Sequence, residues 1–163
     1  MNEVISKTDS TANPGLIASP RGGDYTGILP SQKIKEMLSN GEIKTVLSKI
    51  DDDQVQPASI DLRLGHYAYP VDTSFLPGKD MRVLDKMRQL DEQFADFKID
   101  LSQGAVLEKG RVYVIPLLES IHLRSEVAAF AIPKSSTGRL DILTRLIADE
   151  ATSFDQFTEG YKG

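Results

Sequence analysis

Short apolar segments separated by turn residues set the fold class of this chain. Residues 60–64 alternate between apolar and polar side chains, as in a half-buried strand, and residues 97–101 repeat that alternation. Residues 106–115 predict two strands around a Lys-Gly turn, and 128–132 form a continuous apolar strand. Short strands at this spacing, with little helix and no internal repeat, favour a compact β-barrel or sandwich.

Two helices are predicted beside these strands. Ser31 can cap the first, which Asn40-Gly41 ends, and its core face is expected to hold Ile34, Met37 and Leu38. The second lies between Asp80 and Phe94, where an apolar residue recurs every third position: Met81, Leu84, Met87 and Leu90. We expect this second helix to be an elaboration on the strand scaffold.

The chain has 163 residues, 40% of them hydrophobic, which suits one domain with a proper core. Residues 1–26 are rich in Ser, Thr, Asn, Gly and Pro without periodicity, so we expect a flexible N-terminal arm ahead of a domain at 27–163. No apolar stretch approaches the roughly 20 residues of a membrane span, and no signal-peptide core is visible. These features predict a cytoplasmic protein with no membrane partner.

Charge and cysteine content exclude several classes of function. The formal net charge of −5 argues against non-specific binding of nucleic acid. The chain has no cysteine, which excludes disulfides and thiol nucleophiles. Neither His66 nor His122 has an acid at a spacing that would make a metal pair or a relay, so we expect both to be structural and predict no metal site in the chain.

The segment 133–140 has the chemistry to hold a polyphosphate. Lys134 supplies a point charge, Arg139 a planar fork of donors, and three hydroxyls lie between them, while Gly138 lets backbone approach a ligand closely. The order of residues is not that of a Walker loop. Taken alone, the same segment is also typical of a polar turn at the end of a strand.

A second segment, 56–65, favours the polyphosphate interpretation. Read together, Gln56-Pro57-Ala58-Ser59-Ile60-Asp61-Leu62-Arg63-Leu64-Gly65 and Lys134-Ser135-Ser136-Thr137-Gly138-Arg139 resemble the two best-marked segments of the dCTP deaminases, relatives of the trimeric dUTP pyrophosphatases. The resemblance runs from near Gly27 to about Ala148, roughly three quarters of the chain. It implies a mainly β protein with the dUTPase-like distorted β-barrel of the β-clip type, a short N-terminal helix and one inserted helix.

The resemblance also implies roles for particular residues. The polyphosphate would be gripped by Lys134, Ser135, Ser136 and Arg139. Ser135 and the backbone carbonyl of Ala148 would orient the attacking water, and Arg139 would stabilise the charge that develops. With an insertion of about three residues after Ala148, Asp155 would accept a hydrogen bond from the deoxyribose 3′-hydroxyl. These residues form the predicted catalytic and substrate-binding site.

Two groups of positions are left open by the sequence. Asp149 and Glu150 either face the same cleft or are solvated loop carboxylates. Ser59, Asp61 and Arg63 share one face of their strand and would serve a neighbouring subunit's site or pack an interface. The family's general base is a glutamate a few residues beyond a turn that 161–163 begins, so we expect the domain to be truncated at its C-terminal end and to be part of the longer bacterial form.

The function implied is the metal-independent hydrolysis of dCTP to dUTP and ammonia, with Mg²⁺ carried by the triphosphate and no zinc, since zinc-dependent nucleobase deaminases use cysteine ligands. Two alternatives remain open: a dUTP pyrophosphatase or bifunctional enzyme, and a non-catalytic nucleotide-binding or assembly module. The expected partners are dCTP, dTTP as an inhibitor, and further copies of the chain in a homotrimer or related homo-oligomer.

Overall fold

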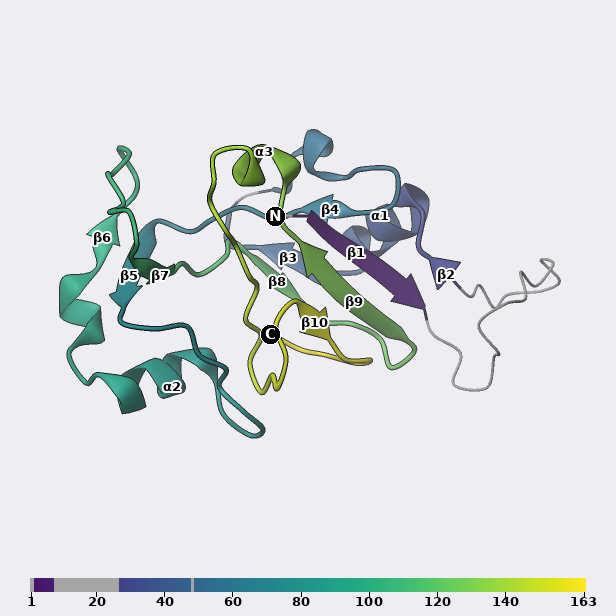
Figure 1. Ribbon diagram of the computed structural model, residues 1–163. Coiled ribbons are helices and arrows are strands. Elements are labelled where there is room, and N and C mark those ends of the chain that lie inside the picture. The colour runs from purple at the N-terminus through teal and green to yellow at the C-terminus, as the bar shows by residue number, and fades with distance from the viewer. Residues whose placement is uncertain (1, 8–26, 48) are drawn as a thin grey trace, which may run out of the picture.

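A computed structural model describes residues 2–7, 27–47 and 49–163, and its largest sheet runs through the middle of the molecule (Figure 1). The strand order is β10-β9-β1-β2, with β4 also paired to β1 and every pairing antiparallel. The strands are β1 (Asn2–Lys7), β2 (Gly27–Ile28), β4 (Ile60–Asp61), β9 (Val127–Ile132) and β10 (Gln156–Phe157). The strand predicted at 128–132 is thus confirmed as β9.

Two smaller antiparallel sheets complete the scaffold. One pairs β3 (Ile43–Thr45) with β8 (Glu119–Ile121), and the other has the order β6-β5-β7 from Ile99–Asp100, Tyr67–Val71 and Val112–Val114. Two 3₁₀ turns, at Asp52–Gln54 and Phe94–Phe97, link these strands to the rest. The mainly β class is confirmed, and the described strands lie in three open sheets.

The first predicted helix is α1 (Ser31–Ser39), whose Ile34 and Met37 are completely buried in the main core. Asn40 is its C-cap, and Gly41 beyond it lies in the left-handed region at φ 71°. Bonds from Gly41 N to Leu38 O and from Glu42 N to Met37 O close this end. The prediction that Ser31 caps the helix is wrong. Pro30 occupies the cap position, and the Ser31 amide donates to Pro57 O at 2.8 Å.

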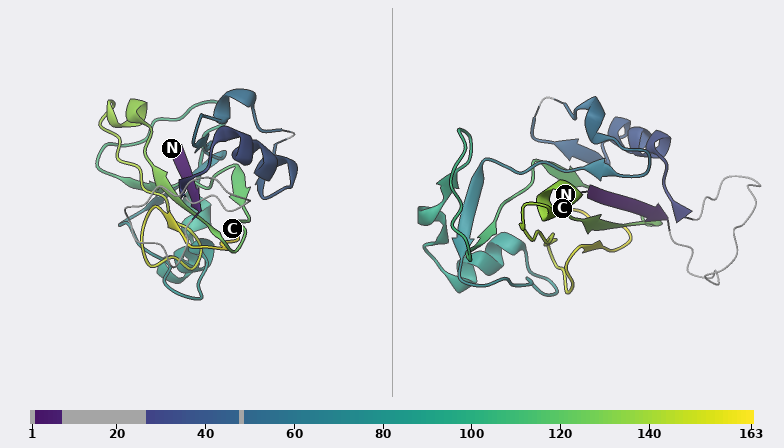
Figure 2. Two further views of the ribbon diagram at one scale, coloured as in Figure 1. Left: turned by 90° about the vertical axis from the view of Figure 1, so that its right-hand side faces the viewer. Right: turned by 45° about the horizontal axis from the view of Figure 1, so that its top comes forward.

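The second predicted helix is α2 (Val83–Leu90). It belongs to residues 67–114, called the insert below, which lie at the left of the molecule in the right-hand view of Figure 2. The four-residue apolar stripe is only partly right, because Met87 is buried while Leu84 and Leu90 are exposed. This helix of eight residues buries one position rather than a whole face. Its neighbour Phe94 packs on Tyr69, with ring centroids 5.4 Å apart.

Three strand predictions extend too far. In 97–101 only β6 forms. The segment 60–64 is a strand only at β4, and Leu64 is exposed, because the backbone beyond Leu62 turns to bond with residues 116–118 instead of a sheet neighbour. In 106–115 only β7 forms, and Val106 is exposed. Residues 2–7, assigned from sequence to the flexible arm, form the central strand β1; the rest of that predicted arm lies outside the described residues.

Candidate functional site

The predicted polyphosphate segment forms one exposed helical turn directly after β9. This turn is α3 (Ser135–Gly138), with Lys134 at its cap position, and it lies at the top of the molecule in Figure 1. Bonds from Thr137 N to Lys134 O and from Arg139 N to Ser135 O hold the turn closed. Ser135, Ser136 and Arg139 are exposed, so a ligand can reach their side chains.

Lys134 has a counter-ion that the sequence did not predict. Its Nζ forms an ion pair with Asp61 Oδ2 on β4, 73 positions earlier in the chain. Asp61 is 8% exposed, and its other oxygen, Oδ1, is buried without a hydrogen-bond partner among the described residues. Arg139 has no ion pair in the part of the chain that the structure describes, so no carboxylate there competes with an incoming anion for its guanidinium.

Asp155 lies beside the end of β9, from which the turn at 134–139 extends. Its carbonyl accepts from Ala131 N at 2.9 Å, and its amide donates to Leu146 O at 2.9 Å. The carboxylate accepts from Leu146 N at 2.6 Å and from Arg145 Nε, and the residue adopts the left-handed region at φ 63°. These contacts fix the carboxylate at the same end of β9 as Lys134, where the resemblance requires a residue that contacts the sugar.

An open cavity of about 600 Å³ runs along β9 and β10 next to Asp155. The guanidinium of Arg145 lies over the ring of Phe154, with 5.1 Å between Cζ and the ring centroid. The lining is Ala128, Ala129, Phe130, Ala131, Arg145, Phe154, Asp155, Gln156, Phe157 and Thr158. Lys134–Arg139 lie outside this lining. Sequence reasoning missed Arg145, whose only signal was a basic residue six positions after Arg139.

Ala148, the predicted water-orienting carbonyl, is buried in the main core. It lies between Leu146, bonded to Asp155, and Asp149, whose carboxylate accepts from Val83 N at 2.7 Å. The Asp149 side chain is 32% exposed, and it contacts the first residue of α2.

Arg63 bonds to side chains of other segments within the fold and does not lie on an open strand face. It donates to Glu119 through both its backbone amide, at 2.8 Å, and Nε, at 2.9 Å, and to Asp51 at 2.8 Å. Gln54 Nε2 also donates to Glu119 and to the carbonyl of Asp61, at 3.2 and 2.8 Å. This network joins β8 to the start of the segment that carries the Lys134 counter-ion.

The described residues contain no group of three or more His, Cys, Asp or Glu side chains that could hold a metal ion. Hydrogen bonds from the Ser102 side chain and backbone lower the pKa of Asp100, a residue on β6 of the insert sheet. That titration lies away from the phosphate turn. None of the helices in the described part is long and apolar enough to cross a membrane.

Comparison with known proteins identifies the family. The model of the 2′-deoxycytidine 5′-triphosphate deaminase (DCD) N-terminal domain matches residues 25–163. The chain is 32% identical over 117 residues to the "dCTP deaminase, dUMP-forming" of Persephonella marina, covering 71% of this chain and 59% of that protein. It is 31% identical over 121 residues to the protein of the same description from Beutenbergia cavernae, covering 74% and 59%.

A solved structure shares both sequence and fold. The crystal structure of 2′-deoxycytidine 5′-triphosphate deaminase from Agrobacterium tumefaciens is 50% identical, with a TM-score of 0.78, over 84% of this chain and 39% of that one. The chain therefore belongs to the family of dCTP deaminase N-terminal domains. It spans about three fifths of the length of the curated relatives that it matches.

Proposed function

We propose that the protein hydrolyses dCTP to dUTP and ammonia. The observation that carries this proposal is the exposed turn at 134–139, which follows the end of β9. In this turn Arg139, which has no ion pair among the described residues, accompanies two accessible serines. Family membership and the dCTP deaminase fold support the assignment of dCTP to that turn.

The triphosphate would bind across α3. Arg139 offers a bidentate guanidinium, and Ser135 and Ser136 offer hydroxyl donors at the first turn of the helix. Lys134 would also contribute its charge, with its side chain fixed by the ion pair with Asp61. Asp155 would accept from the deoxyribose 3′-hydroxyl through a lone pair that Leu146 and Arg145 leave free.

The reaction is attack by water at C4 of cytosine, followed by loss of ammonia. The Ser135 hydroxyl and the Ala148 carbonyl would hold the water, and Arg139 would stabilise the developing charge. One carboxyl can take the proton from the water and deliver it to the leaving ammonia in two steps. By the family resemblance, that carboxyl is a glutamate following the turn at 161–163.

Magnesium would enter this site bound to the substrate. The turn presents cations and hydroxyls, which suit phosphate oxygens rather than a metal ion. Mg²⁺ carried by the triphosphate would neutralise part of the phosphate charge. The proposed deamination uses no zinc.

A second candidate function is hydrolysis onward to dUMP. Relatives at 32% and 31% identity are described as dUMP-forming, whereas the structural neighbour at 50% identity is described as a dCTP deaminase. In the second function, water would also attack phosphorus, with release of pyrophosphate.

We also propose that copies of the chain assemble, as a homotrimer or a related homo-oligomer. Leu140, Ile142 and Leu143 follow the phosphate turn and are exposed, Leu143 to 93%. Such a run of apolar side chains is typical of surfaces that another chain covers. dTTP is the proposed inhibitor, since its triphosphate would occupy the same turn, and the cytoplasm is the proposed location, where these nucleotides are made and used.

Product analysis tests the proposal. The full-length protein is incubated with dCTP and Mg²⁺ while ammonia, dUTP, dUMP and pyrophosphate are quantified. Ammonia with stoichiometric dUTP supports deamination alone, and ammonia with dUMP and pyrophosphate supports the second candidate. Nucleotide binding without any product would favour a non-catalytic module.

A further inference from the structure

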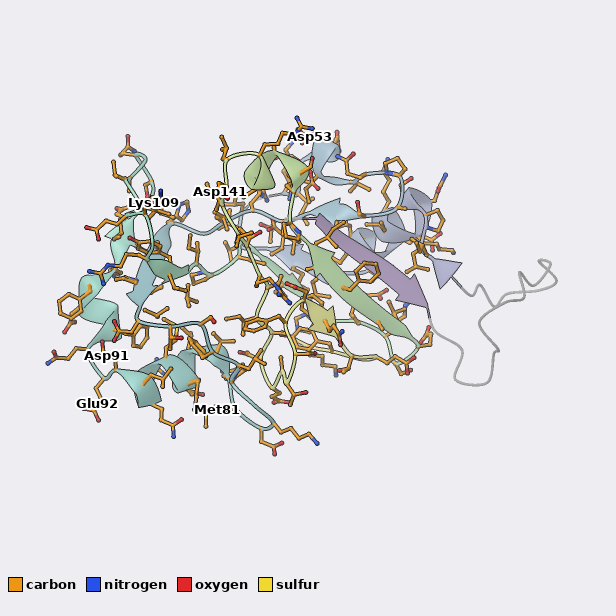
Figure 3. All side chains as sticks on the ribbon, viewed as in Figure 1. Asp53, Met81, Asp91, Glu92, Lys109 and Asp141 are labelled. Atoms are coloured by element: carbon orange, nitrogen blue, oxygen red, sulfur yellow. The ribbon has the colours of Figure 1, made fainter. Side chains whose placement is uncertain are left out.

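Three hydrogen bonds attach the insert to the segment that carries Ala148. Asp149 Oδ1 accepts from Val83 N at 2.7 Å, Glu150 N donates to Met81 O at 2.8 Å, and Gly78 N donates to Ala151 O at 3.1 Å. Figure 3 labels Met81 on the chain that leads into α2, next to the C-terminal part of the chain. Residues 78–83 and 149–151 therefore lie side by side.

Asp149 supplies the cap that α2 lacks locally. Arg82 holds the cap position, and its side chain makes no bond to the helix. The Val83 amide, in the first turn, has no acceptor within the helix and needs one from elsewhere. The carboxylate of Asp149, 66 positions later, accepts that bond and also lies 3.8 Å from Arg82 Nε. A carboxylate at a helix N-terminus is favoured by the helix dipole as well.

The same residue is fixed on its other side. The Asp149 amide donates to the Tyr161 hydroxyl at 3.1 Å, and the Tyr161 ring packs edge-on against Phe157 with centroids 4.9 Å apart. Glu150 next to it adopts the left-handed region at φ 59°, a conformation that a non-glycine residue keeps only when its surroundings impose it. The insert and the C-terminal turn together impose the backbone path that leaves Ala148.

We propose that Asp149 is a positioning residue for the deamination: by capping α2, it fixes the direction of the Ala148 carbonyl that orients the attacking water. This inference rests on the proposed function. Asp149 does not touch substrate. It acts on the reaction through the peptide unit that it shares with Ala148, so its loss should affect the chemical step and leave triphosphate binding at 134–139 intact.

The test compares Asp149→Ala with Asp149→Asn in the full-length protein. The amide oxygen of the Asn variant can still accept from Val83 N, whereas the Ala variant has no acceptor. We expect Asp149→Ala to lower kcat about tenfold or more, since small misplacement of a reacting group costs up to about 100-fold. The KM for dCTP should stay within about twofold, and Asp149→Asn should recover most of kcat.

Arg82→Ala is the matched control, because it removes only the 3.8 Å ion pair and should leave kcat nearly unchanged. Hydrogen exchange at the Val83 and Glu150 amides should accelerate in Asp149→Ala and not in Asp149→Asn. The inference is overturned if Asp149→Ala keeps its kcat, raises only KM, or is not rescued by Asn. A wild-type protein that releases no ammonia from dCTP would instead refute the proposed function itself.

Discussion

Replacing Arg63 by Met should destabilise the fold by leaving a buried charge without its partner. Glu119 has a side chain with 0% exposure and accepts hydrogen bonds from Arg63 Nε, the Arg63 amide and Gln54 Nε2. The Arg63→Met variant keeps the bond from the backbone amide to Glu119 but loses the cation and its bond to Asp51. What remains is a carboxylate in the core with two neutral donors.

The size of this effect follows from the burial of the two partners. Removing one partner of a buried ion pair costs about 3–5 kcal/mol. The Arg63 side chain is 25% exposed, so solvent already screens part of the interaction and we expect the lower end, about 3 kcal/mol. In a domain of this length, that corresponds to a melting temperature lower by about 6–12 °C.

Thermal and urea unfolding of the full-length protein measure this loss. Arg88→Met is the matched control, because Arg88 pairs with Asp85 on the exposed face of α2, and surface pairs contribute about 0–1 kcal/mol. Adding Glu119→Gln to Arg63→Met removes the buried charge while keeping an acceptor for Gln54, and should recover about 1 kcal/mol or more. A wild-type melting temperature in Arg63→Met, with weaker dCTP binding, would refute this reasoning and place Arg63 in a ligand site.

Three further predictions concern the packing of the second motif and the chemistry of the site. Gly65→Ala should destabilise the protein by about 1–3 kcal/mol in urea unfolding, because the added Cβ would lie 2.7 Å from Pro116 O. Gly138→Ala is its control: the Cβ added there has no atom within 4 Å, so this variant should unfold like wild type. Ser135→Ala should lower kcat and kcat/KM together by about 10²–10³ in an ammonia-release assay; a rise in KM alone would make Ser135 a plain phosphate ligand. Deamination should continue with a zinc-selective chelator and stop on magnesium depletion, and inhibition reversed by added zinc would contradict the mechanism.

Local sequence patterns predicted the parts of the fold that depend on neighbouring residues. The apolar run at 128–132 and the helix stop at Gly41 need only their own segments, and both are confirmed as β9 and the end of α1. The accessible turn at 134–139 was likewise visible, because cations, hydroxyls and a glycine directly follow a strand. Its role as a phosphate site stays a prediction.

Contacts between distant segments were not predictable in the same way. The pairing of Lys134 with Asp61 and the capping of α2 by Asp149 each join residues more than 60 positions apart. Periodicity also overstated burial: in α2 only Met87 is buried, while Leu84 and Leu90 are exposed. Which of several equivalent polar residues finds a partner is decided by tertiary packing.

The most direct test of the central claim is calorimetric titration of dCTP with Mg²⁺ into the full-length wild-type protein and into Arg139→Ala. If the turn at 134–139 holds the triphosphate, loss of the unpaired guanidinium should weaken binding by about 2–4 kcal/mol, which is roughly 30-fold or more in Kd. Deoxycytidine, which has no phosphate, should bind both proteins equally weakly. An unchanged affinity for dCTP in Arg139→Ala would remove Arg139 from the site and contradict the account.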